Sequence, residues 1–315
     1  MTTVELEAVL RERSPGVSIP NGVLGRLTGI AARHVAGPEE NASDLAARAA
    51  LTLFARESID PGSIDLVLFA SASRDFVEPA TAHVVQQLIG TKAHCLDVTN
   101  ACNSFMNGID LARAMIIAGR ARRVLVCSGE VPSRAVKLSL TSTEELFHSF
   151  AGYTFGDAGT AVIIEEVATG GLLHLDAFAY SQYWEIGGIF GGGTRHPREI
   201  EHTYFHGRGD ELRAAFEEVG TAPVHAALAS AGTSIDELAA VICHQVTVPY
   251  LERFIDVLGI DPAKVVRTVE QYGNLASCSI PFQLSLQWDR LAPGEKVLFV
   301  GLGGGASLAL AVWER

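Results

Sequence analysis

The sequence predicts an α/β protein made of two similar halves. Short apolar runs rich in Val, Ile and Leu alternate along the chain with longer stretches of helical periodicity. Runs that are apolar throughout are typical of strands that helices cover on both faces. Three sequence patterns also recur in the same order in both halves, which indicates an internal duplication. A length of 315 residues suits one large domain or two linked ones.

These periodicities predict the individual elements. A short amphipathic helix is expected at the N-terminus, ended by Ser14-Pro15. Strands are expected at residues 64–70, 93–98, 124–127, 160–164, 239–243 and 296–300, with a last strand after the glycine-rich turn at 301–305. Helices are expected at residues 43–57, 79–89, 103–118, 211–231 and 249–258, the third and fifth stopped by Gly119 and Gly259. This alternation is typical of the α/β class.

The repeated patterns divide the chain near residue 170. The three pairs are Ser-Ile-Asp at 63–65 and 234–236, Gly-Arg-Ala-Arg-Arg-Val-Leu-Val at 119–126 and Gly-Glu-Lys-Val-Leu-Phe at 294–299, and the glycine-rich turns at 155–159 and 301–305. The first pair is offset by 234 − 63 = 171 residues. We therefore expect one half at residues 1–170 and a second at residues 171–315.

Composition excludes several classes of protein. There are 24 Lys and Arg against 36 Asp and Glu, a net charge of −12, and nucleic-acid binding requires a basic face. No apolar run reaches the roughly 18 residues of a membrane span. The five cysteines form no C-x-x-C pair, so a disulfide framework is not expected. A cytoplasmic protein is the expectation.

Three polar residues stand just beyond predicted buried strands. Cys102 lies between a strand and a helix, where unsatisfied N–H groups should lower the pKa of the thiol. His244 ends a strand of the second half, and Asn274 follows a glycine thirty residues later. Each has a structural alternative: a core cysteine, a satisfied histidine and a turn asparagine. Together they suit thioester chemistry, in which the thiolate takes an acyl group while His and Asn stabilise an enolate or oxyanion.

Glycine-rich segments complete the candidate site. The glycines at 303–305 allow close approach of the backbone to a reacting carbonyl and match no nucleotide-binding motif. Residues 185–209 contain seven glycines and resemble a lid or entrance loop. Its three histidines, His196, His202 and His206, lack metal-ligand spacing, so no metal is expected.

In combination these motifs resemble the thiolase superfamily, and within it the type III β-ketoacyl synthases. The resemblance rests on N-A-C-N-S-F around Cys102, H-Q at 244–245, G-N-x-x-S-x-S-I-P at 273–281 and the closing G-x-G-G-G, and it covers nearly the whole chain. It implies a five-layered α-β-α-β-α fold, a homodimer and coenzyme A thioesters as substrates, with no cofactor.

The resemblance also implies a role for each site residue. Cys102 would be acylated, while His244 and Asn274 would polarise the second thioester. The N–H groups of Cys102 and Gly304 would form the oxyanion hole, and the resemblance places substrate contacts at Arg33, Phe105 and Gly305. Thiolases carry a second cysteine before the final glycine run, but this chain has Gly301 there, which argues against a thiolase reaction.

The segment R-D-F-V-E-P-A-T-A at residues 74–82 is similar to the olefin-pathway enzymes, which join two acyl-CoA chains head to head. There the glutamate matching Glu78 reaches the neighbouring subunit's cysteine and removes an α-proton. Such a base is needed when no carboxylate is lost as carbon dioxide. The structural alternative is that Glu78 only precedes a helix, whose dipole favours a carboxylate at that end.

Other functions stay open on the sequence. They are a malonyl-dependent type III synthase that starts a fatty acid or polyketide, an acyltransferase to an alcohol or amine, and a silent partner subunit. Initiating synthases usually carry an arginine for docking acyl carrier protein where this chain has Pro249, with Arg253 one turn later. The arginines at 120, 122 and 123 offer another basic patch for a carrier protein. The donor is therefore open between coenzyme A and a carrier protein.

Overall fold

The first of two sheets belongs to the N-terminal half. The computed structural model describes residues 1–315, except for the side chains of Asp210, Leu212 and Phe216. The sheet has the strand order β2-β1-β3-β4, in which β1 pairs in parallel with β2 and β3, and β4 is antiparallel to β3. The strands are β1 (Leu66–Ala70), β2 (His94–Val98), β3 (Arg123–Glu130) and β4 (Ala158–Glu165).

The second sheet repeats part of this arrangement in the C-terminal half, a parallel pair of strands followed by an antiparallel one, but its fourth strand lies at the opposite edge. Its order is β5-β10-β9-β8, with β8 parallel to β9 and β10 antiparallel to β9. The strands are β5 (Gly171–Ala179), β8 (Ala240–Cys243), β9 (Lys296–Gly303) and β10 (Ser307–Glu314). The predicted boundary at residue 170 falls between β4, which closes the first sheet, and β5, which joins the second.

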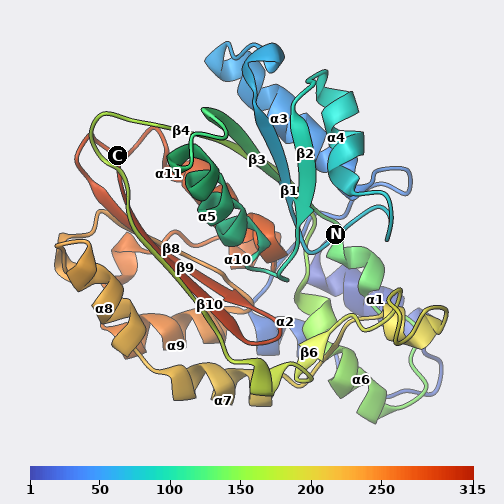
Figure 1. Cartoon of the computed structure of the whole chain (residues 1–315). Helices are drawn as coiled ribbons and strands as arrows, with labels where there is room; N and C mark the ends of the chain where they lie inside the picture. The colour runs from blue at the N-terminus through green and yellow to red at the C-terminus, as the bar shows by residue number, and fades with distance from the viewer.

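Helices separate and cover the two sheets in five layers (Figure 1). The outer face of the first sheet packs against α3 (Ala42–Glu57) and α4 (Thr81–Ile89), and α5 (Ser104–Ile117) and α11 (Ser279–Gln287) lie between the sheets. The outer face of the second sheet packs against α8 (Ala222–Ser230) and α9 (Val248–Leu258). Alternate residues of one strand enter different layers: Leu66 and Leu68 face the central helices, whereas Val67 and Phe69 face α3 and α4.

The remaining helices lie outside these layers or connect them. They are α1 (Thr3–Arg13), α2 (Val23–Thr28), α6 (Thr143–Ser149), α7 (Gly209–Val219) and α10 (Val269–Tyr272), and a two-stranded ribbon pairs β6 (Gly187–Gly188) with β7 (His206–Gly207). Among the described residues, no helix combines the length and apolar character that crossing a bilayer demands.

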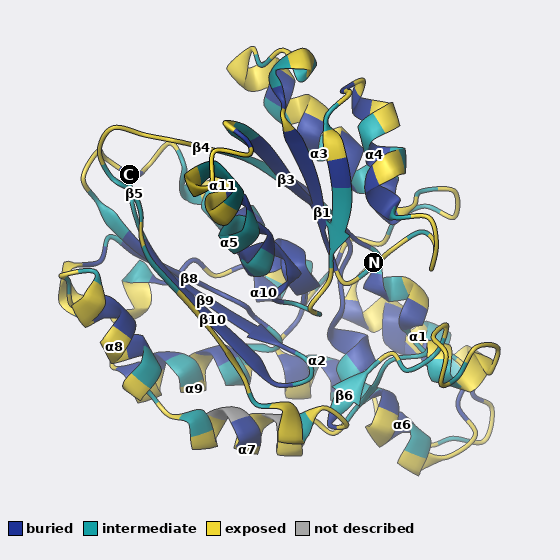
Figure 2. Ribbon diagram, in the orientation of Figure 1, coloured by how far each residue is buried: buried dark blue, intermediate teal, exposed yellow. Residues whose placement is uncertain are grey.

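The elements that were predicted agree with the observed ones within a few residues, apart from one helix, but β5, α2, α6, α10 and α11 were not predicted. The single helix expected at residues 211–231 is two helices, α7 and α8. Gly220 ends the first with φ +65°, a conformation that glycine adopts readily, and Pro223 stands in the first turn of the next. Figure 2 shows the consequence of the layering: strands such as β1, β3, β8 and β9 are mostly buried, β5 at the edge of the second sheet is partly exposed, and the outer helices expose the faces turned away from the sheets.

Candidate active site

Cys102 lies in a tight turn between β2 and α5. Ala101 has φ +47°, which is uncommon for a residue with a side chain and is typical of functional sites. Ser104 stabilises the turn, since its Oγ accepts a hydrogen bond from the Asn100 N–H at 2.8 Å and donates one to the Ala101 carbonyl at 2.6 Å. The cysteine is half-buried, so some of its surface stays accessible.

The thiol of Cys102 is less acidic than the sequence suggests. Desolvation by the surrounding protein, with a smaller contribution from the charge of Glu130, raises its pKa to about 12. The backbone N–H groups of Gly304 and of Cys102 itself act in the opposite direction. The prediction of a lowered pKa is therefore wrong for the free protein, because burial outweighs the hydrogen-bond donors near the helix N-terminus.

His244 is buried directly after β8. Its backbone N–H donates to the Val300 carbonyl at 2.8 Å, and its Nδ1 lies 3.2 Å from the Ser279 Oγ at the start of α11. Burial lowers the pKa of the imidazole to about 4, although a hydrogen bond with the backbone of Ala276 acts in the opposite direction. The ring is therefore neutral at pH 7 and acts as a hydrogen-bonding group rather than as a cation.

Asn274 is buried, and its orientation is set by its own amide oxygen. Its Oδ1 accepts a hydrogen bond from the Ala276 N–H at 2.9 Å, which leaves the NH₂ group as the donor for a ligand. Its backbone pairs with the predicted glycine-rich turn of the first half: the Asn274 N–H donates to the Thr154 carbonyl at 2.8 Å, and the Gly156 N–H donates to the Asn274 carbonyl at 3.0 Å. The two halves thus meet at this residue.

Strand β9 and the hairpin after it connect these groups. Val300 holds His244, and the next residue, Gly301, lies against Asn103, which follows Cys102. The Asn103 amide donates to the Ser307 carbonyl at 3.0 Å and to its Oγ at 2.8 Å, which joins the start of α5 to the hairpin carrying Gly304. The structure therefore brings Cys102, Gly304, His244 and Asn274 into one region between the halves.

Comparison with known proteins identifies the family of the chain. The family model for 3-oxoacyl-[acyl-carrier-protein] synthase III matches residues 96–181, and the model for the C-terminal part of that enzyme matches residues 228–315. An acyl-CoA:acyl-CoA alkyltransferase from Xanthomonas campestris is 30% identical over 99% of this chain and 94% of the relative. The chain belongs to the synthase III family.

Other relatives and solved structures agree with this assignment. A β-ketoacyl-[acyl-carrier-protein] synthase III from Desulfitobacterium hafniense is 32% identical over 91% of this chain and 88% of the relative. The Cys-to-Ser variant of OleA from X. campestris, with bound lauric acid and lauroyl-CoA, has a TM-score of 0.90 at 25% identity and covers 100% of this chain and 95% of that chain. Synthase III from Aquifex aeolicus has a TM-score of 0.83 at 25% identity, with the same shares covered. The fold is thiolase-like, as predicted, and the chain is a synthase III-like acyltransferase.

Glu78 of this synthase III-like chain lies in the exposed loop at residues 71–80, beside the exposed side chains of Phe76 and Val77. The carboxylate at the N-terminus of α4 is a different one. Asp97 accepts hydrogen bonds from the N–H groups of Thr81 and Ala82, each at 2.8 Å. Asp97, not Glu78, is thus the carboxylate that accepts hydrogen bonds from the first N–H groups of this helix, and the role of Glu78 stays a prediction. Within a single chain no contact is recorded between the Glu78 side chain and Cys102.

The three predicted substrate contacts differ in how accessible they are. Arg33 is only 4% exposed, and its Nη2 donates to the Thr3 Oγ1 at 2.9 Å, while Nε and Nη1 have no partner among the described residues. Phe105 is 1% exposed in the core between the sheets. Neither placement supports a contact with substrate in this conformation, because neither side chain offers a surface to one. Gly305 stands in the hairpin turn with φ +77°, and no atom lies within 4 Å of where a Cβ would stand.

The segment at residues 185–209 borders the site at one point. The carbonyl oxygen of Gly187 lies 3.4 Å from where a Cβ of Gly304 would stand. The His196 and His202 rings stack at 3.6 Å, and the described residues hold no cluster suited to a metal ion, so the histidine-rich loop forms no recorded metal site. A role as a lid stays a prediction.

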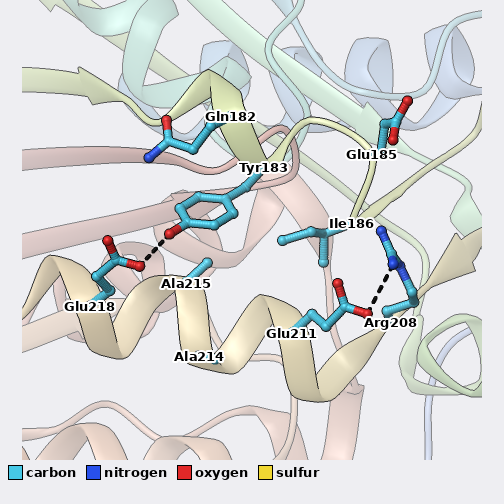
Figure 3. Close-up of a pocket in the computed structure, with 9 residues that line it drawn as sticks. All are labelled: Gln182, Tyr183, Glu185, Ile186, Arg208, Glu211, Ala214, Ala215 and Glu218. Carbon is cyan, nitrogen blue, oxygen red and sulfur yellow. Dashed lines mark hydrogen bonds and ion pairs between the residues drawn. The ribbon is translucent and has the colours of Figure 1, made fainter.

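A cavity of about 320 Å³ lies beside this segment, between residues 182–186 and α7 (Figure 3). Tyr183 points toward Glu218 and donates a hydrogen bond to it, and Arg208 forms an ion pair with Glu211 at 2.9 Å. The predicted catalytic residues do not line this cavity.

Two features of the site escaped the sequence analysis. One is Glu130, a fully buried carboxylate at the end of β3; the signal was a charged residue closing an otherwise apolar strand. The other is the packing of Asn103 against Gly301, which joins positions almost 200 residues apart and has no local signature.

Proposed function

We propose that this chain condenses two acyl-CoA thioesters through an acyl-Cys102 intermediate, with Glu78 of a second copy as the base. The observation that carries the proposal is the position of Glu78 on an exposed loop, with its helix-capping role already taken by Asp97. The likeness to an acyl-CoA:acyl-CoA alkyltransferase over 99% of the chain supports the same reaction.

The first half-reaction acylates the cysteine. The sulfur of Cys102 attacks the thioester carbonyl, and the N–H groups of Cys102 and Gly304 stabilise the resulting oxyanion. The carbon–sulfur bond to coenzyme A breaks, and the proton of the Cys102 thiol is transferred to the departing coenzyme A sulfur. A high thiol pKa suits this exchange, since the resting enzyme keeps a neutral group in a desolvated site.

The second half-reaction forms the carbon–carbon bond. Glu78 removes an α-proton from the second acyl-CoA, and the enolate oxygen accepts hydrogen bonds from His244 and from the Asn274 NH₂ group. The enolate carbon attacks the acyl-cysteine carbonyl, the carbon–sulfur bond breaks, and the proton that Glu78 removed returns to the Cys102 sulfur, which restores the thiol and the carboxylate. The product is a β-ketoacyl-CoA. His244 cannot serve as the base while it donates its proton to the enolate, so a separate carboxylate is required.

In a homodimer, Glu78 of one copy would approach Cys102 of the other. Strand β2 is the edge of the first sheet, with no further strand beside it among the described residues. An uncovered edge strand is a template for pairing with another chain. Phe76 and Val77, which are 51% and 69% exposed, precede Glu78 on the loop near this edge. A homodimer through this face would cover them and carry Glu78 toward the neighbouring site.

The variant Glu78→Gln tests this proposal. Acylation of Cys102 by acyl-CoA should continue, whereas condensation of two acyl-CoAs should be lost. Exchange of the α-proton of bound acyl-CoA with deuterated water should slow to the same extent, because both depend on the base. Glu39→Gln, which changes another exposed loop glutamate, should retain all three activities. If Glu78→Gln condensed as fast as the parent, the proposal would be refuted.

A malonyl-dependent condensation is the second candidate. Relatives named β-ketoacyl-[acyl-carrier-protein] synthase III are 31–32% identical to this chain, which is no lower than the alkyltransferase. Loss of carbon dioxide would then generate the carbanion, and Glu78 would not be needed. Release of carbon dioxide from malonyl thioester, undiminished in Glu78→Gln, would favour this candidate. Comparing acyl-CoA with acyl carrier protein in the same assay would identify the donor.

A further inference from the structure

Glu130 is a buried carboxylate in contact with two loops of the site. It is the last residue of β3, and it is 0% exposed. Its Oε1 accepts a hydrogen bond from the Ala72 N–H at 2.7 Å, and its Oε2 accepts one from the Ser73 N–H at 3.0 Å. The Ser277 hydroxyl also donates to Oε1. A single side chain thus binds the main chain of one loop and a side chain of another.

The two loops carry the groups proposed for the second half-reaction. Ala72 and Ser73 begin the segment that leads to Glu78. Ser277 directly follows Ala276, whose N–H holds the Asn274 oxygen and whose backbone hydrogen-bonds His244. Loops have little regular hydrogen bonding of their own, so a shared partner in the core is an effective way to fix them relative to each other.

Burying the Glu130 carboxylate costs desolvation free energy, which an apolar side chain at this position would not. A buried carboxylate needs hydrogen bonds to offset its desolvation. The negative charge of Glu130 also raises the pKa of the Cys102 thiol, in addition to the larger effect of desolvation. A neutral residue here would make the nucleophile more acidic, so the carboxylate is favoured for a reason other than thiol activation.

We propose that Glu130 is a positioning residue for the second half-reaction, holding the loop of Glu78 and the loop of Asn274 in register beside Cys102. The positioning of Glu78 rests on the proposed function. The positioning of Asn274 requires only a synthase III-like condensation. Glu130 itself touches no reacting atom.

The variant Glu130→Gln provides the test. Glutamine keeps the volume, but its amide nitrogen cannot accept a hydrogen bond, so at least one of the three bonds is lost. Displacement of a reacting group by about 1 Å costs about 10²-fold in rate. Acylation of Cys102 should therefore stay within about threefold of the parent, while condensation and α-proton exchange fall by 10- to 10²-fold. The pH profile of Cys102 alkylation should shift to lower pH, because the neighbouring charge is gone.

Glu7→Gln is the matched control. Glu7 is also a buried glutamate that accepts two backbone hydrogen bonds, from Gly22 at 2.7 Å and Leu24 at 2.8 Å, and it lies in α1 away from the site. It should lower thermal stability without separating the two half-reactions or shifting the alkylation profile. Ser277→Ala removes the hydrogen bond to Glu130 on the Asn274 side, together with the contacts of the same hydroxyl with the Ser128 Oγ and the Ala70 carbonyl, and serves if Glu130→Gln does not fold. It should lower condensation while retaining acylation.

Two results would overturn the proposal. One is equal loss of acylation and condensation in Glu130→Gln, as in a merely destabilised enzyme; the other is no loss of condensation in either variant. An assay with malonyl thioester distinguishes a failure of this proposal from a failure of the proposed function. If the parent condenses only malonyl thioester, the base role of Glu78 fails, and a selective loss of malonyl condensation in Glu130→Gln still supports the positioning of Asn274. Unchanged malonyl condensation would refute it.

Discussion

Replacing Gly301 with alanine should damage both stability and acylation. A Cβ at this position would stand 2.1 Å from the Asn103 Oδ1 and 3.2 Å from the Met106 Cγ. Ordinary contacts begin near 3.4 Å, so Asn103 would have to retreat by more than 1 Å. It cannot do so and keep its hydrogen bonds to the Ser307 carbonyl and hydroxyl, at 3.0 and 2.8 Å.

The expected cost follows from these contacts. Overpacking a core costs about 1–3 kcal/mol, and two lost hydrogen bonds cost about 0.5–1.5 kcal/mol each. Together they amount to about 2–6 kcal/mol. An unfolding entropy of about 2.1 cal/mol/K per residue gives about 0.66 kcal/mol/K for a chain of this length, so Tm should fall by about 3–9 °C. Acylation should slow because the Asn103–Ser307 link joins Cys102 to the hairpin of Gly304.

The assays are thermal unfolding and mass spectrometry of acylated Cys102. Gly25→Ala is the control, since a Cβ there meets no atom within 4 Å, and it should leave both measurements nearly unchanged. Asn103→Ala removes the obstructing oxygen, so the double variant with Gly301→Ala should be less destabilised than the sum of the single variants. Wild-type stability in Gly301→Ala, or strict additivity in the double variant, would refute the steric argument.

Three further predictions concern the proposed catalytic groups. Cys102→Ser should fold normally and form no acyl-enzyme with acyl-CoA, and near-wild-type turnover would contradict the nucleophile assignment. Asn274→Ala should lose about 10²–10³ in condensation, as is typical when an oxyanion donor is removed, and a defect confined to acylation would contradict its role. His244 has a pKa lowered to about 4, so between about pH 6.5 and 4 the unfolded chain binds more protons than the folded one. Stability should therefore fall as the pH drops through this window, and the fall should be smaller in His244→Gln; equal pH dependence of denaturant midpoints would argue against a buried neutral imidazole.

Local chemistry made much of the fold predictable. The apolar runs marked most strands within a few residues because strands between helical layers are buried on both faces, whereas the partly exposed edge strand β5 was not predicted. The repeated Ser-Ile-Asp pattern precedes β1 in the first half and β8 in the second, and each of these strands pairs in parallel with a central strand of its sheet, β3 and β9. The error at residues 211–231 was avoidable, since the sequence contains Gly220 and Pro223 inside the expected helix.

Properties that depend on distant packing were not predictable. The pKa of the Cys102 thiol was expected to fall, but it depends on desolvation and on Glu130, neither of which a helix N-terminus reveals. The sequence did not show that Asp97 binds the first N–H groups of α4, because this carboxylate comes from a neighbouring strand. Burial of Arg33 against Thr3 likewise follows from tertiary packing rather than from its motif.

The electrostatics of the site fit the proposed division of the reaction. Burial moves the pKa of Cys102 up and that of His244 down, so both side chains are neutral at pH 7. A neutral thioester can then enter without displacing an ion pair.

Negative charge develops only as the reaction proceeds, first on the acyl oxygen and then on the enolate oxygen. Fixed donors in a desolvated site stabilise such charge more strongly than water does, because they need no reorganisation. The first charge would meet the N–H groups of Cys102 and Gly304, and the second would meet His244 and Asn274. Because both reacting side chains are neutral, a charged base such as the one proposed, Glu78, would be best brought from outside, and the exposed 71–80 loop would suit that role.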